Sequence, residues 1–367
     1  MKEKFLRVAA IYGANASGKS NLYYAMSYFQ RIIRESFNNV SEDKNTIIAE
    51  CYIPFLFEKN EENSEFEIIE ILDGFEYRYG FEYNKECIVT EWLYRKSLTS
   101  NRTSTIFERT KNSIEFGSSV RKECDLYKNQ ISSETLVLSF FNKLKLKTDV
   151  FQMVYSGIMQ TLVVPADFCG NTKTRDQVLD VFLPSIIDND KSRFLDFLKA
   201  IDTGIMDIDY RKSDTEIDFI TYHSGKDRKK YSLDLFDESE GTIKSIALFI
   251  YAFIAIKGNK SLFIDELNIK LHPLLLKFII DLFYEESSSA QLIYTTHDTT
   301  LMDKKFFRRD QIWFVQKDPF GYSELVALSD FKVRSDASFE KDYLAGVYGG
   351  IPLLKDFEMK EVTDGKR

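Results

Sequence analysis

The sequence has few of the residues that form disulfides or zinc sites. Its 367 residues include only three histidines and four cysteines, and the cysteines lie far apart at Cys51, Cys87, Cys124 and Cys169. No two of them form a Cys-x-x-Cys pair, so the pattern argues against a zinc site. We therefore expect reduced, buried thiols, as in a cytosolic protein.

The sequence also lacks a long apolar run and an excess of positive charge. No apolar stretch reaches the roughly 18 residues that a membrane span needs, and the N-terminal Met-Lys-Glu-Lys is not typical of a signal peptide. We predict a cytoplasmic protein without a membrane partner. The net charge of −8 argues against a generally basic surface for nucleic acid, although a local basic patch stays open.

A glycine-rich loop near the start of the chain carries the clearest functional signal. Residues 5–12 have the pattern of a buried strand, the loop follows, and apolar residues at helical spacing predict a helix over 20–34. This order is typical of a loop that binds the phosphates of ATP, whereas a glycine turn before an ordinary helix is the alternative. The predicted nucleotide contacts are Gly13, Ala14, Asn15, Ala16, Ser17, Gly18, Lys19, Ser20 and Asn21.

Five side chains have predicted chemical roles in this site. Lys19 is expected to contact the β- and γ-phosphates, and the Ser20 hydroxyl to bind Mg²⁺. Asp265 and Glu266 follow the apolar strand Leu262-Phe-Ile264, so Asp265 is a candidate magnesium ligand and Glu266 a candidate to polarise the attacking water. His297 ends the next strand and is a candidate contact of the γ-phosphate. The alternatives are a solvated strand end for the acids and an ordinary surface position for the histidine.

The remaining pattern predicts an α/β fold with an inserted middle. Period-two alternation around Asp73-Gly74 predicts a hairpin, and breaks near Pro165 and Pro184 are expected to interrupt a mainly helical region. The loop strand and the late strands are expected to share one sheet. The predicted parts are 1–50 with the phosphate loop, 51–110 as an antiparallel β block, 111–230 as a mainly helical insertion or lid, and 231–367 with the rest of the site.

The order of these motifs resembles the nucleotide-binding domains of the ABC class, including SMC and DNA-repair heads. More narrowly, it resembles the prokaryotic ABC-like, AAA-type ATPases of the abortive-infection, OLD-related kind. The resemblance implies a P-loop NTPase fold of the ABC-ATPase type with ATP and Mg²⁺ as ligands. The segments that carry it are Ile11–Leu22, Glu238–Thr242, Asp265–Leu267, Leu271–Pro273, Thr295–Thr299, Asp310–Phe314 and Tyr343–Pro352.

The resemblance also implies a partner subunit. Taken alone, Ser239-Glu-Gly241 before a helix indicates only a helix cap. In the resembling proteins this segment is the signature loop, so Ser239 and Gly241 would contact the γ-phosphate bound by the other subunit of a homodimer. Such proteins are often encoded beside an RloB-type, Toprim-like nuclease and are implicated in anti-phage defence. The implied function is an ATP-hydrolysing switch that dimerises on ATP and gates a nuclease or toxin partner.

Several positions depart from the family pattern or stay open. Only about a dozen residues precede Gly13, where family members usually have strands that help to hold the adenine. Asn268 and His272 would line the dimer interface, although His272 could equally cap the helix that begins at Pro273. Gln160 is a candidate for the glutamine loop. No Toprim-like acid cluster follows, so a built-in nuclease is not expected.

Two other functions are compatible with the sequence. The first is a DNA-binding, SMC-like repair or maintenance ATPase, which the acidic net charge disfavours. The second is a nucleotide-sensing scaffold that hydrolyses little ATP. ATPase rates with and without duplex DNA separate the first from the switch, and phosphate release at saturating ATP separates the second.

Overall fold

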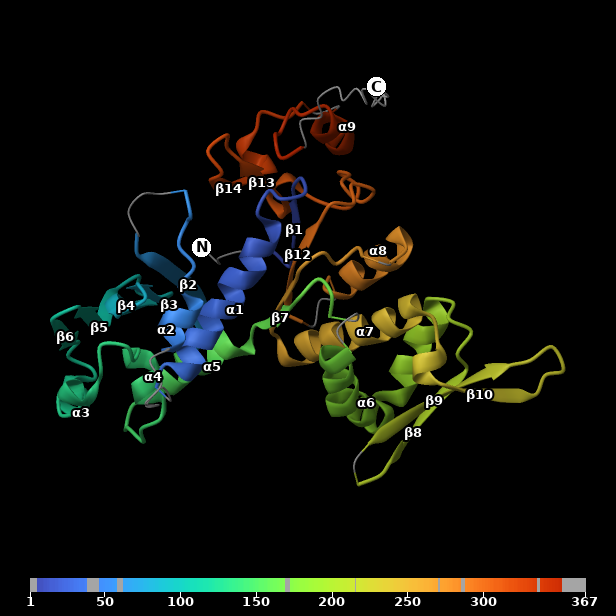
Figure 1. Ribbon diagram of the computed structural model, residues 1–367, viewed down its shortest axis with the longest axis horizontal. Helices are drawn as coiled ribbons and strands as arrows, with labels where there is room; N and C mark the ends of the chain where they lie inside the picture. The colour runs from blue at the N-terminus through green and yellow to red at the C-terminus, as the bar shows by residue number, and fades with distance from the viewer. Residues whose placement is uncertain are drawn as a thin grey trace, which may run out of the picture.

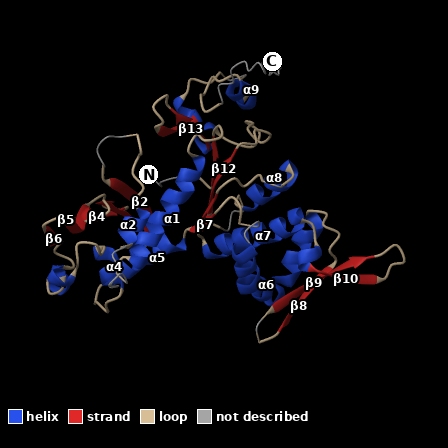
Figure 2. Ribbon diagram, in the orientation of Figure 1, coloured by secondary structure: helices blue, strands red, loops and turns tan. Residues whose placement is uncertain are grey.

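The fold contains a central mostly parallel sheet and two antiparallel sheets (Figures 1 and 2). A computed structural model describes residues 5–37, 46–57, 62–168, 172–214, 216–269, 271–284, 288–334 and 337–351. Cys169 and Pro352 lie outside the described residues, whereas Cys51, Cys87 and Cys124 are free and buried as expected. The α/β class with antiparallel strands is therefore confirmed.

The central sheet contains both the strand before the phosphate loop and the late strands, as the sequence predicts. Its order is β14-β13-β1-β12-β11-β7, and all neighbours are parallel except β14. The sequence analysis had not predicted β7, because this three-residue strand lies inside a region predicted to be mainly helical. The strands are β1 (Val8–Tyr12), β7 (Leu162–Val164), β11 (Ser261–Ile264), β12 (Gln291–Thr296), β13 (Ile312–Lys317) and β14 (Ser323–Ala327).

Alternating residues of β1 divide the core between the two faces of this sheet. One face of the sheet packs against α6, α7 and α8 through a cluster that includes Val8, Ala10 and Tyr12. On the other face, Ile11 packs with Leu22 and Tyr23 of α1. The described helices are α1 (Lys19–Glu35), α2 (Ile47–Cys51), α3 (Arg121–Cys124), α4 (Val137–Asn142), α5 (Val150–Gln160), α6 (Thr172–Ala200), α7 (Glu240–Gly258), α8 (Pro273–Leu282) and α9 (Phe339–Leu344).

The predicted break at Pro184 is wrong, because Pro184 lies inside α6. Leu183 and Ile186, on either side of it, are buried in the core, so their packing holds the helix together across the missing hydrogen bond. The irregular backbone is found instead at Asp190, whose φ of −135° marks a kink between two helical halves.

Helix α7 packs in the central core, where about half of its residues are buried. By length and composition it could cross a membrane, although the sequence was expected to contain no such stretch. More than half of its apolar stretch is buried in the interior, and core helices of soluble proteins can have the same length and hydropathy. This helix is therefore weak evidence for a membrane span.

A five-stranded antiparallel sheet packs beside α1 with its strands in sequence order. The predicted hairpin is confirmed: Asp73 and Gly74 form its turn with φ angles of 47° and 79°. Both central residues of a tight hairpin turn of this kind need positive φ, which Asp-Gly supplies readily. The strands are β2 (Ser64–Leu72), β3 (Phe75–Tyr83), β4 (Ile88–Ser97), β5 (Thr103–Thr110) and β6 (Ser113–Phe116).

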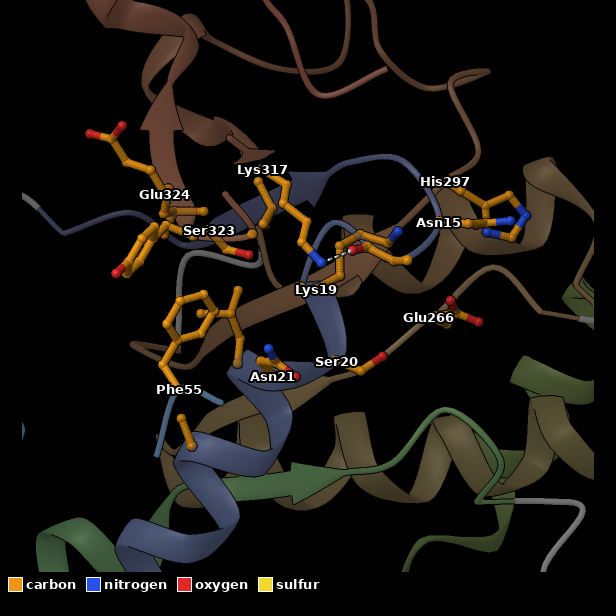
Figure 3. A pocket seen from close by; sticks show the side chains of 18 of the residues that line it. Asn15, Lys19, Ser20, Asn21, Phe55, Glu266, His297, Lys317, Ser323 and Glu324 are labelled. Atoms are coloured by element: carbon orange, nitrogen blue, oxygen red, sulfur yellow. Dashed lines mark hydrogen bonds between the residues drawn. The ribbon is translucent and has the colours of Figure 1, made fainter. Parts of the chain in front are cut away.

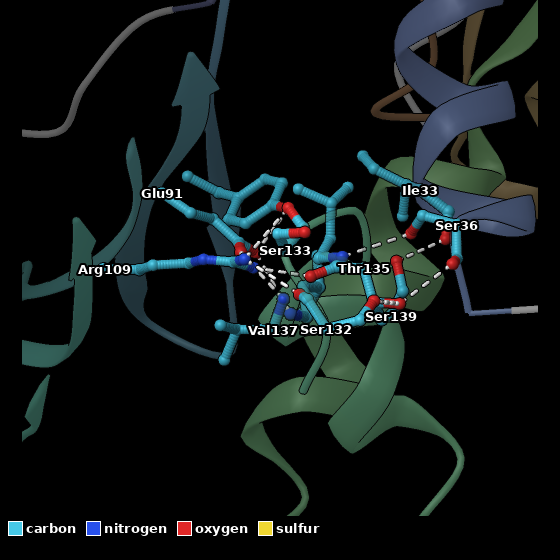
Figure 4. A network of polar contacts seen from close by, with 12 residues as sticks. Ile33, Ser36, Glu91, Arg109, Ser132, Ser133, Thr135, Val137 and Ser139 are labelled. Carbon is cyan, nitrogen blue, oxygen red and sulfur yellow. Dashed lines mark hydrogen bonds and ion pairs between the residues drawn. The ribbon is translucent and has the colours of Figure 1, made fainter. Parts of the chain in front are cut away.

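A buried polar network fixes this sheet to α4 and to the end of α1 (Figure 4). The Glu91 carboxylate, 1% exposed, accepts hydrogen bonds from the Val137 and Leu138 N–H groups at the start of α4. The Arg109 guanidinium lies 3.8 Å from Glu91 and donates to the Thr135 carbonyl oxygen. On the other side, Thr135 Oγ1 donates to the Ser36 carbonyl oxygen and Ser139 Oγ to that of Ile33. The helix after the phosphate loop is thus tied to the antiparallel sheet.

The third sheet extends from the body beside α6 (Figure 1). It has the order β10-β9-β8, with β8 (Asp207–Lys212), β9 (Ile217–Ser224) and β10 (Lys230–Asp234). Thr221 Oγ1 and His223 Nε2 of β9 lie 2.6 and 2.7 Å from Glu238 Oε1. This contact joins the third sheet to the residues that directly precede α7.

Glu70 on β2 is a half-buried residue whose Oε2 atom is buried beside Gly157 of α5. Its Oε2 has no hydrogen-bond partner among the described residues, and burial raises its pKa from 4.5 to about 7. Between about pH 4.5 and pH 7, Glu70 therefore keeps a proton in the folded state that it releases in the unfolded state. The free energy of unfolding consequently falls as the pH rises through this range.

We expect Glu70→Gln to stabilise the protein at pH 8 by up to about 3 kcal/mol and to change little at pH 5. Urea unfolding of both proteins at the two pH values measures this difference. Glu65→Gln, an exposed position on the same strand, is the matched control and should change stability little at either pH. Equal effects of Glu70→Gln at pH 5 and pH 8 would contradict the assignment of a protonated Glu70.

Candidate functional site

A cavity of about 1050 Å³ lies where the central parallel strands end. The strand register places Gly13 beside His297 and Asp265 beside Thr295, because Tyr12 pairs with Thr296 and Ile264 with Tyr294. Figure 3 shows Asn15, Glu266 and His297 at one end of the cavity, Phe55, Ser323 and Glu324 at the other, and Lys19 and Ser20 between them. The cavity therefore has one polar end and one aromatic end.

The loop has the close approaches that require glycine. A Cβ at Gly13 would come within 2.6 Å of Ser17 Oγ, and Gly18 has a φ of +106°, which side chains rarely adopt. Gly18 is also the N-cap of α1, and no side chain in the described structure caps that helix. The positive end of the α1 dipole is thus left to a ligand, as at anion sites on helix N-termini.

Lys19 is folded back onto its own loop. Its Nζ donates hydrogen bonds to the Gly13 carbonyl oxygen at 2.8 Å and to that of Ala14 at 3.0 Å. Burial lowers the pKa of this ammonium group, while the nearby charges of Glu266 and Asp265 act in the opposite direction. A phosphate in the loop would replace carbonyl partners by charged ones and favour the protonated lysine.

The two acids have different environments. Asp265 is buried, and its Oδ1 accepts a hydrogen bond from the Thr295 hydroxyl. Glu266 lines the cavity and has a φ of +46°, in the left-handed region that is strained for residues other than glycine. Its N–H donates to Thr295 Oγ1 at 2.7 Å. Thr295 therefore holds the turn that directs Asp265 into the interior and Glu266 into the cavity. No sequence pattern had indicated this role of Thr295.

His297 lines the same cavity as Lys19 and Glu266. Its Nε2 lies 3.4 Å from Asn268 Nδ2, and Asn268 Oδ1 accepts a hydrogen bond from Thr296 Oγ1 at 2.8 Å. Asn268, which the family pattern had indicated only as an interface residue, thus also contacts the imidazole. The structure thus brings Lys19, Glu266 and His297 together at one cavity, and their chemical roles stay predictions.

The second wall of the cavity was missed by the sequence analysis. The hairpin of β13 and β14 lies on the phosphate loop: Ser323 Oγ donates to the Ser17 carbonyl oxygen at 2.7 Å, and Lys317 Nζ to that of Ala16 at 3.4 Å. Phe55 and Tyr322 complete this wall. Their only sequence signal was the high aromatic content, because they are 267 positions apart and belong to no known phosphate-loop motif.

Ser239 and Gly241 are not among the residues that line the cavity. Ser239 is exposed at the N-cap of α7, where its Oγ accepts a hydrogen bond from the Thr242 N–H at 3.1 Å. Figure 1 shows α7 beginning on the side of the molecule that carries β8 to β10, away from the start of α1. The capping interpretation is confirmed, and the nucleotide contact stays a prediction that needs a second subunit.

Two other predictions can be compared with the structure. Gln160 ends α5 before β7 begins, so it lies at the amino end of that strand, opposite the edge with Asp265. The glutamine-loop prediction for Gln160 is therefore not supported. His272 caps α8 as one of the two alternatives predicted, because its Nδ1 accepts a hydrogen bond from the Leu274 N–H at 3.2 Å.

The residues present fit a nucleoside triphosphate with its magnesium ion. Ser17 Oγ is buried without a hydrogen-bond partner in the described part of the chain, and Ser20 lies in the first turn of α1 at the cavity. Among the described residues, no group of three or more His, Cys, Asp or Glu side chains is placed to hold a metal ion. A magnesium ion at Ser20 and Asp265 would therefore take most of its ligands from phosphate and water, as it commonly does.

One protein family matches more than half of the chain. Residues 8–140 and 177–303 match the family described as "AAA domain, putative AbiEii toxin, Type IV TA system". The chain belongs to this AAA family. It is a P-loop protein of the AAA/ABC-like ATPase group, and the first matched segment contains the phosphate loop while the second contains Asp265, Glu266 and His297. None of the curated proteins matches the sequence.

Two solved SMC heads are similar to this AAA-family chain. The SmcHead bound to the C-winged helix domain of ScpA is 16% identical with a TM-score of 0.44, and the match covers 89% of this chain and 93% of that chain. The SMC head domain from Thermotoga maritima is 15% identical with a TM-score of 0.41, and the match covers 88% and 90%. At these identities the likeness is one of fold alone.

Proposed function

We propose that this AAA-family protein binds ATP with Mg²⁺ in the cavity and hydrolyses it. The observation that supports the proposal is the convergence of Lys19 and Ser20 from α1, Glu266 from the turn after β11 and His297 from the loop after β12 around one cavity. Lys19 and the loop N–H groups hold the phosphates and stabilise the negative charge of the transition state. Magnesium, held by Ser20 and Asp265, would neutralise phosphate charge.

The proposed reaction is attack of water on the γ-phosphorus. Glu266 lines the cavity through its left-handed turn and accepts the proton of the attacking water. The bond between the γ-phosphorus and the bridging oxygen breaks, which leaves ADP and inorganic phosphate. His297, held beside Asn268, donates a hydrogen bond toward the γ-phosphate.

We propose further that hydrolysis requires two copies of the chain. The cavity contains the phosphate loop, whereas the exposed Ser239 and the half-buried Gly241 lie at the start of α7 and do not line the cavity of the same chain. A head-to-tail pair would bring Ser239 of one copy to the phosphates of the other. ATP then stabilises the dimer only to the extent that it binds the closed form more tightly.

The proposed role of this switch is to gate a partner effector, a nuclease or a toxin, in anti-phage defence. The description of its family names an abortive-infection toxin and a type IV toxin–antitoxin system, which supports a defence role. An ATP-dependent dimer offers the partner two forms of the protein with different surfaces.

Release of phosphate from ATP tests the central part of this proposal. The purified protein should release phosphate at saturating ATP and Mg²⁺, and Lys19→Ala should reduce the rate to background because the phosphates lose their main cationic partner. Nucleotide binding without any phosphate release by the unmodified protein would instead indicate a nucleotide-sensing scaffold.

A further inference from the structure

The end of the cavity away from Glu266 is lined by aromatic side chains. Phe55, Phe57 and Tyr322 are all part of this wall, and the rings of Phe55 and Tyr322 have centroids 4.3 Å apart. Phe57 is 75% exposed and Tyr322 is 45% exposed. Large aromatic surfaces left open beside a polar site commonly mark a place where a ligand binds.

This wall is held at a fixed place relative to the phosphate loop. Ser323, which follows Tyr322, bonds to the Ser17 carbonyl oxygen, and Lys317 bonds to that of Ala16. Gly321 has a φ of +101°, and a Cβ there would come within 3.1 Å of the Phe57 ring. The turn therefore needs glycine, which lets the backbone come close to the rings.

The polar groups beside these rings could form hydrogen bonds with the base and the ribose of a nucleoside. Asn21, Ser323 and Glu324 line the cavity beside the rings and offer an amide, a hydroxyl and a carboxylate. Glu324 can accept hydrogen bonds from an amino group of a base or from the hydroxyls of a ribose. The two ends together provide a cationic, glycine-rich site for phosphates and an aromatic site with hydrogen-bond acceptors.

We infer that the wall formed by Phe55, Phe57 and Tyr322 binds the purine base of the nucleotide. This inference rests on the proposed function, because it takes the phosphates to bind at Lys19. The base stacks on the aromatic rings, as bases do in other protein sites, and a purine offers a larger surface for stacking than a pyrimidine. The hairpin of β13 and β14 contributes Tyr322 to this base site, and Phe55 and Phe57 come from the segment after α2.

Comparison of two ligands that share the phosphates but not the base tests the inference. Binding of ATP and of inorganic tripolyphosphate, each with Mg²⁺, is measured by calorimetry for the unmodified protein and for Phe55→Ala and Tyr322→Ala. We expect each variant to bind ATP about tenfold more weakly and tripolyphosphate unchanged. The preference of the unmodified protein for ATP over CTP should shrink in both variants.

Phe320→Ala is the matched control. Phe320 lies in the same turn and is as exposed as Phe57, but it is not among the residues that line the cavity, so its removal should leave both affinities unchanged. Unchanged ATP binding by Phe55→Ala and Tyr322→Ala would overturn the base site, as would an equal loss of both ligands. Lack of binding of either ligand by the unmodified protein would overturn the proposed function itself and the base site with it.

Discussion

ATP turnover is expected to fall by about a hundredfold or more when Glu266 is replaced by glutamine. Glutamine keeps the size of the side chain and its place in the cavity but cannot accept the proton of the attacking water. The substitution leaves the proposed phosphate contact of Lys19 and the proposed magnesium contact of Ser20 unchanged, so ATP should bind at least as tightly as before. Because bound ATP then persists, Glu266→Gln should accumulate as an ATP-bound dimer.

Phosphate release and light scattering measure the two parts of this prediction. The scattering mass should double with ATP for Glu266→Gln and stay that of one chain without nucleotide. Glu70→Gln makes the same chemical change far from the cavity, in the antiparallel sheet, and is the control that should keep its turnover. A Glu266→Gln protein that stays monomeric with ATP would contradict the dimer, and one that keeps its turnover would contradict the role of Glu266.

The second large effect is the recovery of activity when two inactive variants are mixed. Lys19→Ala lacks the phosphate contact of its own loop. Ser239→Asp retains a residue that can cap α7 but places a negative charge where the proposed dimer brings the γ-phosphate. Each variant alone should be inactive, because every site in its dimers has one defective half.

A mixed dimer contains one site with both halves intact. It joins the loop of the Ser239→Asp chain to the Ser239 of the Lys19→Ala chain. Random pairing of equal amounts should therefore restore up to about a quarter of the unmodified rate if the two sites work independently. Phosphate release by the separate and mixed proteins measures this. No recovery on mixing, with both variants folded and Ser239→Asp still binding ATP, would show that Ser239 does not complete a neighbour's site.

The sequence by itself determined the features that depend on neighbouring residues. The phosphate loop was predictable because strand, glycines, lysine and helix lie within one short segment, and the Asp73-Gly74 hairpin because two adjacent residues supply the positive φ its turn requires. The ends of β11 and β12 could also be inferred, since parallel strands bring their carboxyl ends to one edge of a sheet. These signals indicated Asp265, Glu266 and His297 before any contact was known.

Only the tertiary structure decided the features that depend on contacts between distant segments. Packing of Leu183 and Ile186 carries α6 through Pro184, where local propensity favoured a break. The pairing of β7 with β11 excludes Gln160 from the edge with the acids. The aromatic wall joins Phe55 to Tyr322, and no periodicity or motif relates residues so far apart. Such contacts arise from the packing of the whole chain, so the sequence could predict the phosphate loop but not the aromatic wall beside it.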